Sequence, residues 1–406
     1  MVRWWYGPLD SFGDGAVALD LPALADLGAL HIARFPGAGP IVLPALARAA
    51  SVYVSEAPAL TALELPALTD TKGVYVHGAG ALARLDLGAL ERAGLGVASV
   101  SLPGTPAADG IKVEAAPALT SLDLGALREV ATLWLLGLPL GALDLPSLVE
   151  ADTIRFGEDS AIAWNQVTTP RLTGPVTPMD VVLPSLVRVG DAFFLHDRRI
   201  RRFDAPQLTA VDAYLRLHDL PNLATVRLPS LVDAAPGWLS FVHDPALLTV
   251  DLPALRTVGR LAAVDTALAA VDLPGLELAT DQLTAYDNPA LTSLRLPAVT
   301  ASSALYLDHN PALVAIDLAS LASTGSVWVG GHAALTALSL PALVEVATSV
   351  DVRDNPVLAA LSLPALRRAG EVHVVGQPAL DRCAVEAELA DVAVAGEVEV
   401  EGMCGL

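Results

Sequence analysis

Aromatic side chains recur at one position of a repeated pattern in this sequence. The position is the middle of a short apolar-x-apolar segment, and its aromatic occupants include Tyr53, Tyr75, Trp134, Tyr306 and Trp328. In an exposed row, such rings could stack on sugars or anchor a protein partner, because Tyr and Trp dominate interface hot spots. The rings could equally pack across neighbouring strands and stabilise a sheet. The sequence leaves both interpretations open.

An arginine cluster is the second candidate site. Residues 196–202 read His-Asp-Arg-Arg-Ile-Arg-Arg, so His196 precedes Arg198, Arg199, Arg201 and Arg202. An irregular turn that contains Trp164 lies shortly before it. Guanidinium groups bind carboxylates and phosphates through paired hydrogen bonds, so the cluster predicts a site for a carboxylate, a phosphate or an acidic peptide. The alternative is that these arginines form salt bridges with acidic neighbours.

Acidic residues occupy the outward position of another repeated segment: Asp86, Asp123, Asp144, Asp251, Asp272 and Asp317. A calcium-dependent carbohydrate lyase on a β-helix would use such carboxylates, with an Arg or Lys as its base. These residues follow the general pattern of the repeat, and no single copy collects extra ligands. A solvated acidic face is the ordinary explanation.

Histidines fall in the turns that follow the aromatic positions, at His196, His218, His243, His309 and His332. They could bridge a metal ion, or they could satisfy backbone groups of the turns. The sequence has no zinc-ligand spacing, phosphate-binding loop, Gly-x-Ser-x-Gly or His-Glu-x-x-His motif. We therefore predict no catalytic residue, no metal site and no cofactor, and we do not expect an enzyme.

The framework that positions these residues is a repeat. The motif apolar-x-Leu-Pro-x-Leu, clear at residues 361–366, returns along nearly the whole chain. Its Pro position marks seventeen copies: 22, 44, 66, 88, 103, 125, 146, 170, 184, 206, 229, 253, 274, 297, 319, 341 and 364. The motif and the apolar-x-apolar segment both alternate with a period of two, which predicts two strands per copy. A fixed period of this length predicts a solenoid whose stacked coils share one core.

The expected fold is therefore mainly β, a parallel β-solenoid of about 17 coils. It should form a single domain over residues 17–380, with an N-terminal cap at 1–16 and a C-terminal cap at 381–406. Helical spacing of apolar residues between 384 and 392 predicts a short helix over the last coil. Two intervals, 88–103 and 170–184, are short and predict shortened coils that form a notch or a bend.

Composition and charge narrow the function further. The chain has 406 residues and a net charge of −21, which argues against direct binding of nucleic acid or anionic lipid. Mean hydropathy is +0.52, yet no apolar run approaches the roughly 20 residues of a spanning helix. No secretory signal is visible, so we expect a cytoplasmic protein, or an exported one if the chain is a mature fragment. The composition suggests a bacterial source.

The complete repeat unit is visible at residues 288–297, Asn-Pro-Ala-Leu-Thr-Ser-Leu-Arg-Leu-Pro. It resembles the bacterial relatives of the receptor L-domain, the right-handed leucine-rich solenoid of insulin- and growth-factor-receptor ectodomains. The resemblance covers about residues 17–380 and implies a right-handed solenoid that binds without catalysis. The segment from Cys383 to Cys404 resembles the Cys-closed cap of that group, which implies a disulfide; in a reducing cytoplasm the two thiols would stay free.

The sequence thus predicts a binding or assembly scaffold whose outer faces meet a protein or a glycan, without membrane insertion. Two alternatives stay open. One is a β-helix carbohydrate-active enzyme, a lyase or hydrolase. The other is an acidic mimic of nucleic acid that occupies a basic protein. Neither the partner nor the oligomeric state follows from the sequence.

Overall fold

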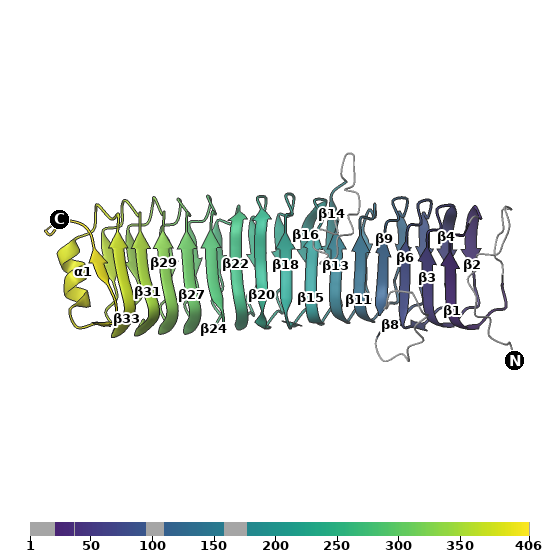
Figure 1. Ribbon diagram of the computed structural model, residues 1–406, viewed down its shortest axis with the longest axis horizontal. Helices are drawn as coiled ribbons and strands as arrows, with labels where there is room; N and C mark the ends of the chain where they lie inside the picture. Colours follow the sequence, from purple (N-terminus) through teal and green to yellow (C-terminus); the bar gives the residue numbers. More distant parts are fainter. Residues whose placement is uncertain (1–20, 36, 95–108, 158–176, 406) are drawn as a thin grey trace. The chain divides into compact units, whose positions relative to one another are not determined.

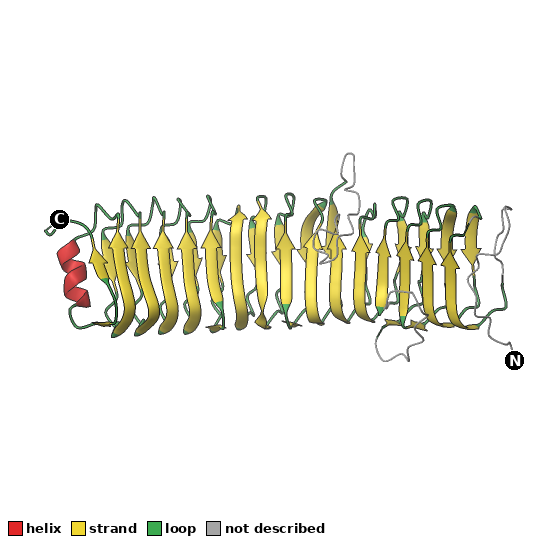
Figure 2. Ribbon diagram, in the orientation of Figure 1, coloured by secondary structure: helices red, strands yellow, loops and turns green. Residues whose placement is uncertain are grey.

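The computed structural model describes residues 21–35, 37–94, 109–157 and 177–405. It is mainly β and parallel, a β-solenoid of about 16 turns with very little helix (Figure 2). The chain divides into two compact units, Met1–Gln207 and Leu208–Leu406, called here the N-terminal and C-terminal units. In each unit, successive strands lie side by side in chain order (Figure 1).

The N-terminal unit has a wide face of mostly longer strands and a narrow face of mostly shorter ones. The wide face contains β1 (Asp26–Ala33), β3 (Arg48–Ser55), β5 (Asp70–Thr71), β6 (Gly73–His77), β8 (Arg92–Ala93), β9 (Gly110–Glu114), β11 (Glu129–Leu136), β13 (Glu150–Gly157) and β15 (Arg188–His196). The narrow face contains β2 (Gly39–Val42), β4 (Leu60–Glu64), β7 (Arg84–Asp86), β10 (Ser121–Asp123), β12 (Leu143–Asp144), β14 (Met179–Val182) and β16 (Ile200–Asp204).

The C-terminal unit repeats this arrangement. Its wide face contains β17 (Ala210–Val211), β18 (Tyr214–His218), β20 (Asp233–Asp244), β22 (Thr257–Thr266), β24 (Leu278–Ala279), β25 (Gln282–Tyr286), β27 (Ala301–Asp308), β29 (Ser323–Gly330), β31 (Glu345–Arg353), β33 (Arg368–Val375), β34 (Ala393–Val394) and β35 (Val398–Val400). Its narrow face contains β19 (Thr225–Arg227), β21 (Thr249–Asp251), β23 (Ala270–Asp272), β26 (Ser293–Arg295), β28 (Ala315–Asp317), β30 (Ala337–Ser339) and β32 (Ala360–Ser362).

Stacked leucines form the core of each unit. In the N-terminal unit Leu63 lies directly opposite Leu85 on the next coil, and both side chains are fully buried. In the C-terminal unit Leu338 and Leu361 pair in the same way. Each buried leucine stabilises the fold by roughly 1.5–3 kcal/mol. Leucines about one repeat apart therefore lie above one another, as the period predicts.

Buried asparagines hold successive turns of the C-terminal unit together. The side-chain oxygens of Asn288, Asn310 and Asn355 each accept a hydrogen bond from a backbone N–H of the preceding coil, at 3.0 Å. Asn310 and Asn355 also donate through Nδ2 to carbonyls of that preceding coil. This turn ladder satisfies buried backbone groups that would otherwise cost free energy. It explains why Asn-Pro recurs in the sequence.

The two shortened coils predicted at 88–103 and 170–184 are wrong. β7 pairs directly with β10, with Asp86 opposite Asp123, and β12 pairs directly with β14, with Leu143 opposite Val181. Each short interval thus belongs to one long coil, whose residues 95–108 or 158–176 lie outside the described part of the chain. An interval of 14 or 15 residues is too short for two strands and two turns. Two of the seventeen markers thus have no coil of their own, while β34 and β35 add a coil after the last marker, so the number of turns is about 16.

Helix α1 (Arg382–Leu389) covers the last coil of the C-terminal unit, where it packs against β32 and β35. The helix starts at residue 382 and ends at residue 389, whereas the predicted segment runs from 384 to 392. Its start is set by the Asp381 side chain, which caps the helix by accepting a hydrogen bond from the Cys383 N–H. Val385 and Leu389 are buried beneath it. The predicted boundaries of the caps and of a single domain stay predictions.

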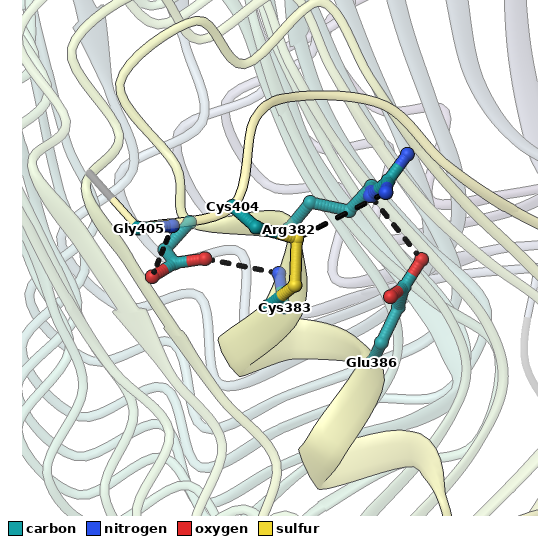
Figure 3. Close-up of a disulfide and its surroundings, with 6 residues drawn as sticks. Arg382, Cys383, Glu386, Cys404 and Gly405 are labelled. Carbon is teal, nitrogen blue, oxygen red and sulfur yellow. Dashed lines mark hydrogen bonds and ion pairs between the residues drawn. A yellow bond between two sulfur atoms is a disulfide. The ribbon is translucent and has the colours of Figure 1, made fainter.

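A disulfide joins Cys383, in the first turn of α1, to Cys404 (Figure 3). Arg382 lies beside it and pairs with Glu386 one helical turn later, at 3.4 Å. The Asp381 carboxylate also accepts from the Gly405 N–H at 3.3 Å, which fixes the tail against the helix. Within the described ranges, no helix has the length and apolar character needed to cross a bilayer.

Candidate functional site

The outward column predicted from the sequence exists on the wide face of the N-terminal unit. Strand pairing places each of its members directly opposite the next: His31, Tyr53, Tyr75, Lys112, Trp134, Arg155 and Phe194. We call these seven residues the N-terminal ladder. It brings together three of the predicted site residues, Tyr53, Tyr75 and Trp134.

Aromatic and cationic groups alternate in contact along the N-terminal ladder. The rings of Tyr53 and Tyr75 are stacked with centroids 5.0 Å apart. Lys112 Nζ lies 4.7 Å from the centre of the Trp134 ring, and Arg155 Cζ lies 4.8 Å from it. Since Lys112 and Arg155 belong to the coils on either side, both faces of the indole are covered by cations. Such contacts contribute about 0.5–1 kcal/mol each at exposed sites.

The corresponding column of the C-terminal unit is interrupted. Its members in register are Arg216, Ser240, Ala262, Thr284, Tyr306, Trp328, Asp351 and His373. We call them the C-terminal ladder. Tyr306 and Trp328 stack 5.9 Å apart, and Arg353 Cζ lies 5.4 Å from the Trp328 ring on the far side. Three small, buried side chains separate this pair from Arg216.

A second aromatic group flanks Arg216. Arg216 Cζ lies 4.6 Å from the Tyr214 ring and 4.9 Å from the Trp238 ring, and Arg260 Cζ lies 5.3 Å from Trp238. Burial lowers the pKa of Arg216. Tyr214, Trp238 and Arg260 were not among the predicted site residues, although all three lie two residues before the ladder position in their own strands.

Polar side chains beside the N-terminal ladder form one further group that the sequence analysis missed. The Tyr75 hydroxyl donates to Glu114 Oε1 at 3.1 Å, and His77 Nδ1 lies 3.3 Å from the same oxygen. Burial, reinforced by Glu114, raises the pKa of Tyr75, and burial lowers the pKa of Lys112. His77 and Glu114 are opposite one another in the strand register. Each of these two residues lies two positions after a ladder residue in its own strand, so the repeat places them at the same position of successive coils.

Four of the six acidic positions of the narrow face, Asp86, Asp251, Asp272 and Asp317, lie beside arginines. In the C-terminal unit Arg295 lies 3.4 Å from Asp272 and 3.7 Å from Asp317, and Arg227 lies 3.6 Å from Asp251. In the N-terminal unit Arg84 contacts Asp86 at 2.9 Å. Exposed pairs like these contribute only about 0–1 kcal/mol. They offset repulsion between stacked carboxylates, and the exposed side chains agree with the solvated acidic face expected as the ordinary explanation of this column.

The histidines serve turns and neighbouring side chains. His243 and His309 have positive φ values of 56° and 48°, in the left-handed region that His, Asn and Asp tolerate better than other side chains. His309 Nδ1 lies 2.9 Å from Asp308, and His218 Nε2 lies 2.7 Å from the Ser240 hydroxyl. His332 is buried in the turn ladder, and burial lowers its pKa.

Among the described residues, three side chains bring potential metal-ligand atoms together: Asp381, Cys383 and Cys404. Their two sulfur atoms are joined in the disulfide, so they do not offer thiolates. Asp381 meanwhile accepts from two backbone N–H groups, of Cys383 and Gly405.

One member of the arginine cluster, Arg199, is internal, which corrects its predicted role. Arg199 is 7% exposed and pairs with the buried Asp197 at 2.6 Å. Its Nη1 and Nη2 donate to the carbonyls of Leu140 and Leu138, at 2.8 and 2.9 Å. The prediction that Arg199 meets a partner is therefore wrong, because its guanidinium is consumed inside the fold.

The neighbouring arginines form the salt bridges that the sequence analysis raised as an alternative. Arg201 pairs with Asp180 at 3.2 Å, and Arg202 pairs with Asp204. A partner role for Arg201, Arg202, Arg198 and His196 stays a prediction. Trp164, the remaining predicted member, lies outside the described residues.

No protein family matches the sequence, and no curated protein matches it. Among solved structures, the chain is similar to the functional domain of InlJ from Listeria monocytogenes, which includes a cysteine ladder. The identity is 16% over 78% of this chain and 73% of that one, with a TM-score of 0.17. It is also similar to YopM from Yersinia enterocolitica WA-314, at 17% identity over 94% of this chain and 87% of that one, with a TM-score of 0.19. At these TM-scores the likenesses carry no argument about this chain.

Proposed function

We propose that this chain is a non-enzymatic scaffold that binds a protein partner along its wide faces, chiefly through the N-terminal ladder. The observation that carries the proposal is the unbroken register of aromatic and cationic side chains from His31 to Phe194. Trp, Tyr and Arg are the residues in which binding energy concentrates at protein interfaces. Strand pairing fixes their spacing in advance, so little conformational entropy is lost when a partner docks.

A protein partner fits the exposed atoms better than a glycan does. Sugar rings stack on open aromatic faces, whereas cations cover both faces of Trp134, and Tyr306 and Arg353 cover those of Trp328. The ladder residues from His31 to Arg155 are partly exposed, while Phe194 is buried. The partly exposed groups suit the mixed polar and apolar surface of a protein interface.

The relation to receptor L-domains, a bacterial source and an exported location belong to the same proposal. The disulfide between Cys383 and Cys404 supports export, because disulfides persist in oxidising compartments. The carbohydrate-active enzyme is not proposed: the acidic column that motivated it is held by Arg84, Arg227 and Arg295.

The test is affinity capture from the source organism with three immobilised forms of the chain. The wild type is compared with Trp134→Ala/Arg155→Ala on the wide face and with a matched control, Arg84→Ala/Asp86→Ala, on the narrow face. We expect the wide-face variant to lose at least tenfold of the captured protein, while the control keeps it. Equal recovery by all three forms, or capture of glycans alone on an array, would overturn the proposal. Far-ultraviolet circular dichroism verifies that each variant is folded.

A further inference from the structure

Strand pairing along the narrow face of the C-terminal unit is interrupted twice, and the first interruption is the step from β21 to β23. β19 pairs with β21, and β23 pairs with β26, but β21 and β23 belong to different sheets. Either side of this step, Leu228 N–H donates to Asp251 O and Leu273 N–H donates to Arg295 O, each at 3.0 Å. Within residues 177–405, the corresponding bond from Leu252 to Asp272 is absent. On the narrow face, therefore, no strand-to-strand backbone hydrogen bond joins β21 to β23.

Small side chains lie in the core behind the open step. The inner column of the wide face runs from Phe241 through Ala263 and Ala285 to Leu307, each opposite the next. Two alanines thus stand where the flanking coils have a phenylalanine and a leucine. The missing volume leaves a cavity of about 30 Å³. Its lining includes Leu252, Leu261, Leu268, Leu273, Leu283 and Leu294.

The cavity is reachable from solvent through the open step. Val250 of β21 and Val271 of β23 both line it, and both are partly exposed although they point toward the core. The equivalent inward residue of the paired strand β19, Val226, is fully buried. A second step between separate sheets, from β28 to β30, has the larger Leu307 and Val329 beneath it. The unpaired step and the cavity therefore lie at the same place, between β21 and β23.

We propose that this opening is a binding site for the end of a small, uncharged alkyl group. The lining is apolar apart from Asp272 and Thr284 at its margin, and apolar cavities accept apolar guests in preference to water. Asp272 in the lining pairs with Arg295, and Asp251, next in sequence to the lining residue Val250, pairs with Arg227, so the rim offers an ionic group no unbalanced charge. At about 30 Å³ the cavity is far smaller than the roughly 150 Å³ cavity that holds a benzene ring, so it admits the tip of a chain and excludes a ring.

The experiment uses pentane as the linear probe and cyclohexane as a matched bulky hydrocarbon. The methyl resonances of Ala263 and Ala285 are followed by carbon–proton NMR of the full chain in buffer saturated with each. We expect pentane to shift both methyls in the wild type and cyclohexane to leave them unchanged. In Ala285→Leu, which copies Leu307 of the next coil, the Ala263 methyl should no longer respond to pentane.

Three results would overturn the proposal: no shift with pentane in the wild type, equal shifts with both hydrocarbons, or a pentane shift that survives in the filled variant. Ala285→Val serves as a second filled form if Ala285→Leu does not fold. Ala33→Val, on the wide face of the other unit, controls for a general effect of added methyl groups and should leave the pentane response intact.

Discussion

The wide faces of the two units have the same strand register but fill it differently. In the N-terminal unit, large rings and cations occupy the outward column from His31 to Phe194. In the C-terminal unit, Ser240, Ala262 and Thr284 interrupt that column, and Ala263 and Ala285 thin the core behind it. The C-terminal unit depends instead on buried turn side chains such as Asn310. One repeat can therefore build either a continuous column of rings and cations or a stretch of small side chains with a cavity behind it.

The largest effect is expected from a substitution that disrupts the buried pair of Arg199 and Asp197 in the N-terminal unit. Arg199→Met leaves Asp197 buried without its partner and removes the donors to two carbonyls, Leu138 O and Leu140 O. Loss of one member of a buried pair costs about 3–5 kcal/mol. Urea denaturation should show this loss, while the exposed Arg201→Met changes stability by less than about 1 kcal/mol. Equal effects of the two variants would contradict the internal role of Arg199.

The next effect concerns an irregular position of the turn ladder in the C-terminal unit. Asp244 is fully buried, its Oδ1 accepts from the Leu220 N–H at 2.9 Å, and its Oδ2 has no partner in the described structure. Burial, with Asp219 and Asp265 nearby, raises its pKa from 3.8 to about 8. The folded chain thus holds a proton that the unfolded chain releases above pH 3.8.

Stability from Asp244 is therefore fully present below pH 3.8 and is lost as the pH rises to about 8. Asp244→Asn supplies the donor that Asn310 uses at its own position and should remove this part of the pH dependence. Thermal melts between pH 4 and 9 test it: the wild type should lose several degrees relative to the variant. Parallel curves for the two proteins would show that Asp244 is ionised throughout.

A smaller effect tests the N-terminal ladder itself. Trp134→Leu keeps an apolar side chain but removes the contacts with Lys112 and Arg155, which are worth about 0.5–1 kcal/mol each. We expect a loss of about 1–2 kcal/mol in the free energy of unfolding measured in urea. Ala262→Leu, at the interrupted position of the other unit, breaks no such contact and is the matched control. A larger loss of unfolding free energy in Ala262→Leu than in Trp134→Leu would contradict the stabilising role of the two cation–ring contacts.

The smallest effect is a gain in the C-terminal unit. The Thr284 hydroxyl is buried and has no hydrogen-bond partner in the described part of the chain. Thr284→Val keeps the shape and removes the unsatisfied group, so stability should rise by about 1 kcal/mol. Differential scanning calorimetry would register an increase in Tm. A decrease would mean that the hydroxyl has a partner, such as an ordered water.

The repeat makes the fold and the ladder register predictable, because residues one period apart must occupy the same place on successive coils. His31, Tyr53 and Tyr75 align for this reason alone. The markers at 103 and 170 misled the coil count, since a proline near the expected spacing looks like a coil until the strand pairing on either side is known. A single-sequence pattern does not distinguish the two cases.

Other features depend on contacts far apart in the chain. Arg199 is buried because the carbonyls of Leu138 and Leu140, about 60 residues earlier, lie against it. The opening at β21 and β23 arises from a missing strand pairing that no residue type signals. Ala263 and Ala285 were visible in the sequence as small members of an otherwise large column, and they are the only part of this site that the repeat could have indicated.

Hydroxyl-radical footprinting of the chain with its captured partner tests the central claim most directly. Oxidation of Tyr53, Tyr75 and Trp134 on the wide face should fall several-fold in the complex, while Val182 on the narrow face keeps the oxidation rate of the unbound chain. Protection of Val182 with unchanged oxidation of the three aromatic residues would contradict the account.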